Sequence, residues 1–96
     1  LPEDRSGIFC GNDLIGMGVL DALRRGGVSV PDRCAVIGFD DIAQSGWEAY
    51  RLSSMRFPVE EMIDIAVNYL TEDRERYAGC HRFLCSFVQR QTTPEI

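Results

Sequence analysis

The sequence predicts an α/β fold in which helices cover a mainly parallel sheet, and two observations favour this class. The run Ala35, Val36 and Ile37 shows no polar alternation, which is typical of a strand buried on both faces of a parallel sheet. Residues 8–39 follow the order strand, helix, strand, which is the pattern of a right-handed crossover between parallel neighbours. A chain of 96 residues has room for one modest core.

The first strand and the helix after it have clear boundaries. Residues 8–10 form a short apolar run that ends at Gly11, after which apolar residues recur at helical spacing. We expect a helix over residues 14–25, with Asp13 as its N-cap. Two cations followed by two glycines, at residues 24–27, favour the end of this helix.

The second half of the chain contains one clear helix between weaker elements. Apolar side chains at helical spacing predict a helix over residues 59–70, and we interpret it as a packing element rather than a binding site. Residues 41–51 are expected to form a loop and residues 52–55 a short strand. Residues 73–79 are expected to be a charged turn, and residues 81–90 are a strand candidate.

Polar side chains follow both predicted parallel strands at the point where each strand ends. Asn12 follows the first strand, and Asp40 and Asp41 follow the second. Neighbouring parallel strands end on the same side of a sheet, about 4.8 Å apart, so we expect Asn12 and Asp40 to project into one crevice. An amide and a carboxylate suit the hydroxyls or ring nitrogens of a small polar ligand. The alternative, that the aspartates only cap the following turn, is open at this point.

Composition excludes some classes of partner. The formal net charge of −5 indicates that this segment does not itself wrap nucleic acid, because phosphate contact relies on clustered cations. The apolar stretches are far shorter than the roughly 18 residues that a membrane span needs, so no membrane partner is expected. The chain begins with Leu1 and shows no targeting segment, so we expect an excised piece of a longer protein.

The cysteines are expected to be free, buried thiols, which suits a reducing cytoplasm. They are Cys10, Cys34, Cys80 and Cys85. Cys80, His81 and Cys85 could approach a metal, but they offer only three ligands at an odd spacing. We therefore expect no metal and no cofactor.

Four motifs stand in register along essentially the whole chain: IFCGND, GVSVPDRCAVIGFDD, LSSMRFPVEEM and FVQRQTT. Together they resemble the carboxyl-terminal third of a LacI/GalR-family bacterial transcription regulator. The resemblance implies a Rossmann-like three-layer α/β/α architecture, with residues 1–96 as an incomplete fragment of a two-lobed, periplasmic-binding-protein-like effector domain. It assigns residues 1–55 to the second lobe, residues 56–84 to the first lobe, and residues 85–96 to a return into the second lobe.

The resemblance also implies roles for single residues. Asn12 and Asp40 match the effector-contacting amide and acid of the family. Phe57 stands where a polar residue commonly borders the cleft, so its ring is expected to stack on a sugar or base. Asp41 is expected to be structural and to bond the backbone of its own loop.

A further implication is a homodimer. The helix of residues 14–25, with Met17 on its exposed face, and the loop position of Trp47 resemble the dimer surface of the family. An exposed Trp is expensive unless it packs against a ligand, a partner or the domain surface, and we favour a partner. The expected protein is a cytoplasmic regulator that binds a small effector, a sugar before a nucleobase. Operator DNA would bind through an amino-terminal helix-turn-helix head that is absent here.

Two alternatives come from other functional classes. A periplasmic sugar-binding protein of a transporter shares the fold and the cleft, but the free cysteines and the motif framework favour the regulator. An enzyme in which Asp40 and Asp41 bind Mg²⁺ or accept phosphate would need a placed lysine, a nucleophile or a glycine-rich phosphate loop, and the sequence lacks them.

Overall fold

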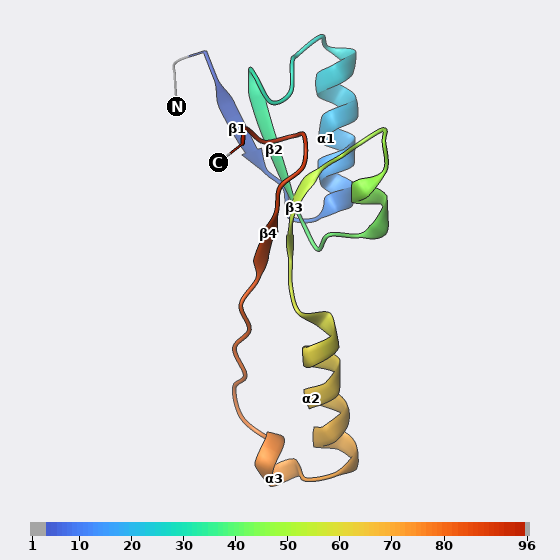
Figure 1. The fold of residues 1–96 in the computed structure, drawn as a ribbon, viewed down its shortest axis with the longest axis vertical. Coiled ribbons are helices and arrows are strands. Elements are labelled where there is room, and N and C mark those ends of the chain that lie inside the picture. Colours follow the sequence, from blue (N-terminus) through green and yellow to red (C-terminus); the bar gives the residue numbers. More distant parts are fainter. Residues whose placement is uncertain (1–3, 96) are drawn as a thin grey trace.

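The computed structural model describes residues 4–95 and contains a four-stranded sheet in the order β1-β2-β3-β4 (Figure 1). The strands are β1 (Ser6–Phe9), β2 (Cys34–Phe39), β3 (Ser53–Arg56) and β4 (Ser86–Val88). The first three strands are parallel, and β4 runs antiparallel to β3. The predicted α/β class with a mainly parallel sheet is therefore confirmed.

Helix α1 (Asp13–Arg25) packs against one face of the sheet and makes the core with it. The central cluster consists of Cys10, Leu20, Val36 and Leu52. On β2 the burial alternates, so that Cys34, Val36 and Gly38 are buried and the residues between them are half-buried. The prediction of a strand buried on both faces therefore holds fully only on the α1 side, because no described helix covers the other face.

The expected exposure of Met17 is wrong. Met17 is only 8% exposed, and the buried residues of α1 are Asp13, Gly16, Met17 and Leu20. These positions recur every three or four residues and form one stripe along the helix, which faces the sheet. Met17 thus belongs to the stripe that packs inward, and the outer face of α1 exposes Leu14 and Ile15 instead.

The start of α1 also differs from the prediction. Its N-cap is Asn12, whose side-chain oxygen accepts a hydrogen bond from the Ile15 amide at 2.9 Å. Asp13, predicted as the cap, is the first helical residue and is buried. Asn and Asp both cap helices well, so residue preference alone does not distinguish a helix capped by Asn12 from one capped by Asp13.

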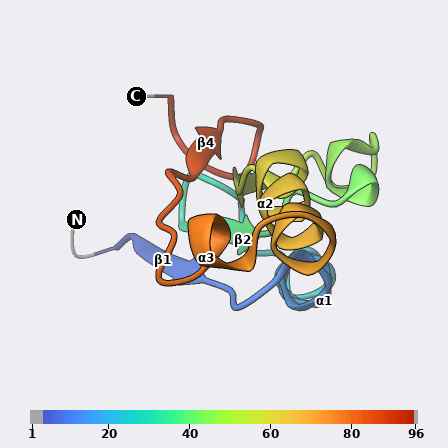
Figure 2. The same cartoon turned by 90° about the horizontal axis from the view of Figure 1, so that it is seen from below.

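Beyond the sheet the chain is elongated. After β3 it runs into α2 (Val59–Thr71) and α3 (Arg74–Tyr77), which extend away from the sheet before the chain returns to β4 (Figure 1). Figure 2 shows the same elements from below, with α2 and α3 in front of the sheet. The radius of gyration is 17.2 Å, whereas a compact chain of this length has one of about 12.5 Å. No residue of α2 is buried by the described part of the chain. Its apolar side chains therefore lack the packing partners that the predicted role requires.

Three smaller expectations need correction. The predicted charged turn over residues 73–79 contains the one-turn helix α3, capped by Asp73, and the loop over residues 41–51 contains a short 3₁₀ helix at Ala43–Gly46. Of the strand candidate at residues 81–90, only β4 pairs with the sheet.

The cysteines divide into two pairs. All four are free, but only Cys10 and Cys34 are buried, while Cys80 and Cys85 are exposed. Both exposed residues lie in the part of the chain that extends away from the sheet.

Among residues 4–95, no helix is long and apolar enough to cross a membrane.

Candidate functional site

A pocket of about 360 Å³ opens where the chain leaves the sheet at the carboxyl end of β3. Its lining includes a cation, a ring and several acids: Asp40, Asp41, Arg56, Phe57, Glu60 and Glu61. The carboxyl ends of parallel strands are the usual ligand side of an open α/β sheet. The pocket brings together two of the predicted site residues, Asp40 and Phe57.

Asp40 occupies an unusual backbone conformation directly after β2. Its φ angle is 108°, and the φ angle of Asp41 is 54°, so two consecutive residues lie in the left-handed half of the Ramachandran map. The Asp40 amide still donates to the Met55 carbonyl at 2.9 Å, which ties the turn to β3. Strained backbone of this kind persists only where the surrounding structure holds it, and it concentrates at functional sites.

Phe57 forms an aromatic wall of the pocket. Its ring stacks on Phe39 with centroids 6.0 Å apart and an angle of 20° between the planes. Phe39 is the last residue of β2, so this contact fixes the segment after β3 to the end of the neighbouring strand. Aromatic side chains in such walls can stack on a sugar or base ring, as expected for Phe57.

Asn12 lies at the end of the adjacent strand but does not line this pocket. Its side-chain oxygen is engaged by the helix cap, whereas the described residues provide no hydrogen-bond partner for its amide nitrogen. Only the NH₂ group of Asn12 is therefore free to donate to a ligand. The structure brings Asn12 and Asp40 to the same edge of the sheet, and within residues 4–95 their side chains do not hydrogen-bond to each other.

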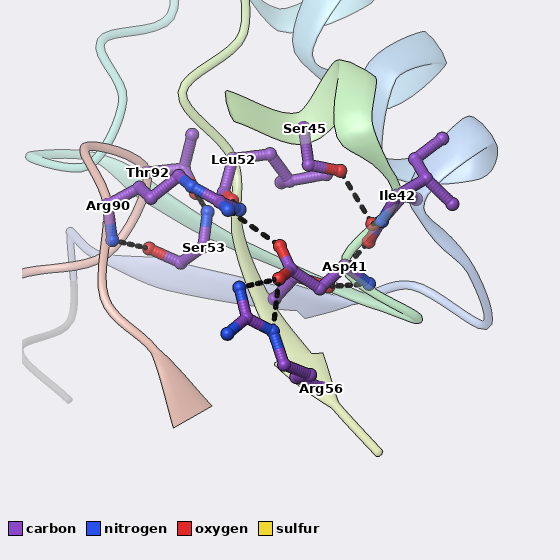
Figure 3. A network of polar contacts seen from close by, with 10 residues as sticks. Asp41, Ile42, Ser45, Leu52, Ser53, Arg56, Arg90 and Thr92 are labelled. Atoms are coloured by element: carbon purple, nitrogen blue, oxygen red, sulfur yellow. Dashed lines mark hydrogen bonds and ion pairs between the residues drawn. The ribbon is translucent and has the colours of Figure 1, made fainter. Parts of the chain in front are cut away.

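Asp41 is held by two arginines from distant parts of the chain (Figure 3). Its Oδ2 atom accepts a hydrogen bond from Nε of Arg56 at 2.7 Å and lies 2.5 Å from Nη2 of the same side chain. Its Oδ1 atom forms an ion pair with Nη2 of Arg90 at 2.6 Å, without the alignment of a hydrogen bond. Asp41 is thus structural, as expected, but its carboxylate binds these arginines rather than the backbone of its own loop.

The charge of Asp41 is favoured by these partners. Its side chain is 3% exposed, and burial by itself raises the pKa of a carboxyl group. The guanidinium groups of Arg90 and Arg56 outweigh this desolvation, so the pKa of Asp41 lies below its ordinary value. The carboxylate therefore stays ionised at neutral pH.

Asp13 forms a second buried carboxylate network, which sequence reasoning missed. It accepts hydrogen bonds from Ser45 Oγ at 2.5 Å, Ser54 Oγ at 2.7 Å and the Ile42 amide at 2.8 Å. Asp13 therefore joins α1 to the loop after β2 and to β3. The signal that could have revealed it is its position on the same helical stripe as Met17 and Leu20.

Trp47, the residue that follows the 3₁₀ helix, is 58% exposed. Two residues further on, the Ala49 carbonyl accepts a hydrogen bond from the Arg24 guanidinium, which joins this loop to the last turn of α1. The loop that carries Trp47 is thus joined to the carboxyl-terminal turn of α1. Met17 packs against the sheet and is not part of this exposed surface.

Comparison with known proteins identifies the family. The profile of the periplasmic binding protein-like domain matches residues 1–93, and the matching curated proteins are LacI/GalR-type transcription regulators. The chain belongs to the LacI/GalR family. The regulator AscG of Escherichia coli is 42% identical over 65 residues, which are 68% of this chain and 19% of AscG. The regulator GalS of Salmonella typhimurium is 36% identical over 88 residues, covering 88% of this chain and 26% of GalS.

Solved structures of the LacI family agree with the fold. The crystal structure of AscG superposes with a TM-score of 0.76 at 32% identity, covering 90% of this chain and 32% of that one. A LacI-family regulator from Lactobacillus casei with bound glucose superposes with a TM-score of 0.76 at 29% identity, covering 91% of this chain and 32% of that one. The LacI-family chain therefore spans between a fifth and a third of these relatives.

The relatives are transcription regulators rather than enzymes. The alternative of an Mg²⁺-binding or phosphate-accepting enzyme is thus not favoured, and neither is the transport protein. Residues 1–93 match the periplasmic binding protein-like domain, and the fold is that of LacI-family regulators.

Proposed function

We propose that this LacI-family chain supplies one wall of the effector cleft of a cytoplasmic transcription regulator, and that the effector is a sugar, with a nucleobase as the second choice. The observation that carries the proposal is the pocket at the end of β3, where Asp40 in its strained turn meets the Phe57 ring. A carboxylate accepts hydrogen bonds from hydroxyls, and a ring packs against the apolar face of a sugar. Asn12 would add its amide hydrogens from the next strand.

The two-lobed arrangement forms part of the same proposal. Residues 1–55 belong to one lobe, residues 56–84 to the other, and residues 85–96 return to the first of these. Two observations support the division: the chain leaves the sheet after Arg56 and pairs with it again at Ser86, and α2 exposes an apolar side between these points. The rest of the lobe that contains residues 56–84, outside this chain, would cover that apolar side.

Regulation then follows from a shift between arrangements of the two lobes. An effector that contacts both lobes favours the arrangement in which both sets of contacts form. Operator DNA, bound by a head outside this chain, would sense the shift through a homodimer. The change in DNA affinity is limited by the difference in effector affinity between the two arrangements.

The dimer surface is proposed on the outer face of α1 and the loop beside it. Leu14 and Trp47 are exposed apolar side chains on these two elements, and Arg24 links the elements to each other. In a twofold dimer each such surface meets its own copy.

The test is fluorescence anisotropy of the full-length regulator on DNA from its own promoter, at fixed salt, with glucose, sucrose, ribose and adenosine as probes. We expect one compound to change the DNA affinity. Asp40→Ala should abolish that response and leave effector-free DNA affinity unchanged, because the described residues give the Asp40 carboxylate no hydrogen bond and the proposal assigns it to the effector. Asp32→Ala is the matched control, since Asp32 is exposed and lies before β2, far from the pocket.

Two results would contradict the proposal. A response that survives in Asp40→Ala would remove Asp40 from the site. Binding of a sugar by a full-length protein that never binds its promoter DNA would favour a solute-binding protein instead.

A further inference from the structure

We propose that Asp41 is a positioning residue that couples effector binding to the relative placement of the two lobes, through its ion pairs with Arg56 and Arg90. This inference rests on the proposed function. Asp41 does not need to touch the effector for this role. It acts on the segment by which the chain leaves the sheet and ties that segment to a residue that follows β4.

The first step of the argument is where the two arginines lie. Arg56 is the last residue of β3, directly before the chain departs towards α2, and Arg90 follows β4, where the chain has come back. The two strands are antiparallel neighbours, with Arg56 opposite Ser86. One carboxylate from the turn after β2 thus binds the residue at which the chain leaves the sheet and a residue that follows the returning strand (Figure 3).

The second step is that the two ion pairs are unequal. Arg90 is also anchored elsewhere, because its Nη1 atom donates to the Leu52 carbonyl at 2.7 Å and its backbone amide donates to Ser53 Oγ at 2.9 Å. Leu52 and Ser53 are fully buried. The side chain of Arg56 is 61% exposed, and within residues 4–95 its guanidinium bonds only to Asp41. Asp41 therefore connects a fixed arginine of the sheet to an arginine on the departing segment.

The third step links this network to the pocket. Asp40 and Asp41 are consecutive residues with positive φ angles, so the turn has few alternative conformations. Displacement of the Asp40 backbone by a bound effector must move the Asp41 carboxylate with it. Separation of Arg56 would leave the Oδ2 atom of this buried carboxylate without its partner, which is costly, so Arg56 follows the carboxylate. Arg56 and Phe57 carry that displacement into the departing segment.

The experiment measures the ratio of DNA affinities with and without saturating effector, in the full-length protein. The probe is glucose, or sucrose if the wild type responds only to that sugar. Asp41→Asn keeps the shape of the side chain and removes its charge, and should reduce the ratio about fivefold or more. Because the ratio is taken at saturation, a change in effector affinity alone does not alter it.

A double variant tests whether the effect passes through Arg56. Arg56→Gln should reduce the ratio like Asp41→Asn, and the pair Asp41→Asn and Arg56→Gln should reduce it no further. Additive losses would overturn the proposed route. If Asp41→Asn fails to fold, Arg56→Gln decides alone, because Arg56 is a surface residue, and a wild-type ratio in that variant would overturn the inference.

The matched control is Asp13→Asn, which also neutralises a buried carboxylate but whose bonds all stay within residues 1–55. It should lower the free energy of unfolding and leave the ratio unchanged. An equal loss of the ratio in Asp13→Asn would show that both variants merely loosen the fold. A wild type that gives no response refutes the proposed function itself, whereas a responding wild type with unaltered variants refutes only the role of Asp41.

Discussion

At the scale of single residues, the buried carboxylates dictate which neighbours are tolerated. A Cβ atom at Gly38 would lie 2.1 Å from Oδ1 of Asp13 and 2.9 Å from Cδ2 of Leu52. Asp13 cannot move away easily, because three donors hold it. Gly38 is therefore required by close packing of β2 against the start of α1, whereas Gly18 on the outer side of α1 has open space around it.

This contrast gives a matched pair of glycine substitutions. Gly38→Ala should lower the free energy of unfolding by about 2 kcal/mol or more, since the methyl group forces Asp13 off its donors. Gly18→Ala should raise that free energy by about 0.5–1 kcal/mol, because alanine is the better helix former. Urea denaturation of the full-length protein measures both. Equal effects of the two substitutions would contradict the packing argument.

At the scale of elements, one residue serves α1 and the proposed site together. Asn12 caps the helix with its oxygen and keeps its NH₂ group for a ligand. The cap fixes the side chain in one orientation, so the NH₂ group is preorganised rather than mobile. Because the cap already holds this side chain, a ligand that binds its NH₂ group costs little further conformational entropy.

Asn12→Ser separates the two roles, because serine also caps helices but carries no amide. We expect unchanged stability and a roughly 3- to 10-fold loss of effector affinity, the size of one hydrogen bond. Asn12→Ala should lose the cap as well, at about 1 kcal/mol of stability. Isothermal titration and thermal unfolding measure the two properties. Wild-type effector affinity in Asn12→Ser would exclude the amide from the site.

At the scale of the whole molecule, the described residues do not cover all of their own apolar surface. Its extents are 55 × 25 × 18 Å, and α2 projects from the sheet with its apolar side chains exposed. The relatives are three to five times longer than the matched region, and our proposal assigns the cover of that helix and of the open sheet face to the rest of the full-length protein. Exposed apolar surface that remains, as at Trp47, is then available to a second copy.

Trp47→Glu tests the proposed dimer surface in the full-length protein. The substitution removes the packing of the Trp47 ring and places two glutamates opposite each other in a twofold contact, where they repel. We therefore expect the dimer dissociation constant to rise at least about tenfold. Arg33→Glu is the control, because Arg33 is exposed and directly precedes β2, outside the proposed dimer surface. Sedimentation velocity measures the association. An unaltered dimer in Trp47→Glu would place the interface elsewhere.

Local and periodic signals were sufficient for much of this protein. Apolar runs and helical spacing predicted α1, α2 and the three parallel strands, since these patterns follow directly from backbone geometry. Strand-to-helix order also placed Asn12 and Asp40 at one edge of the sheet, because right-handed crossovers leave few topologies. The family resemblance, confirmed by the comparisons, supplied the type of function.

Tertiary structure decided which polar groups are buried and with whom. Asp13 and Asp41 look alike in the sequence, but one joins α1 to its neighbours and the other binds Arg56 and Arg90 from segments 15 and 49 residues away. Such pairings depend on how strands separated in sequence come together, and no local pattern encodes them. The inward position of Met17 was readable from helical spacing, whereas the Asp41 network required the folded chain.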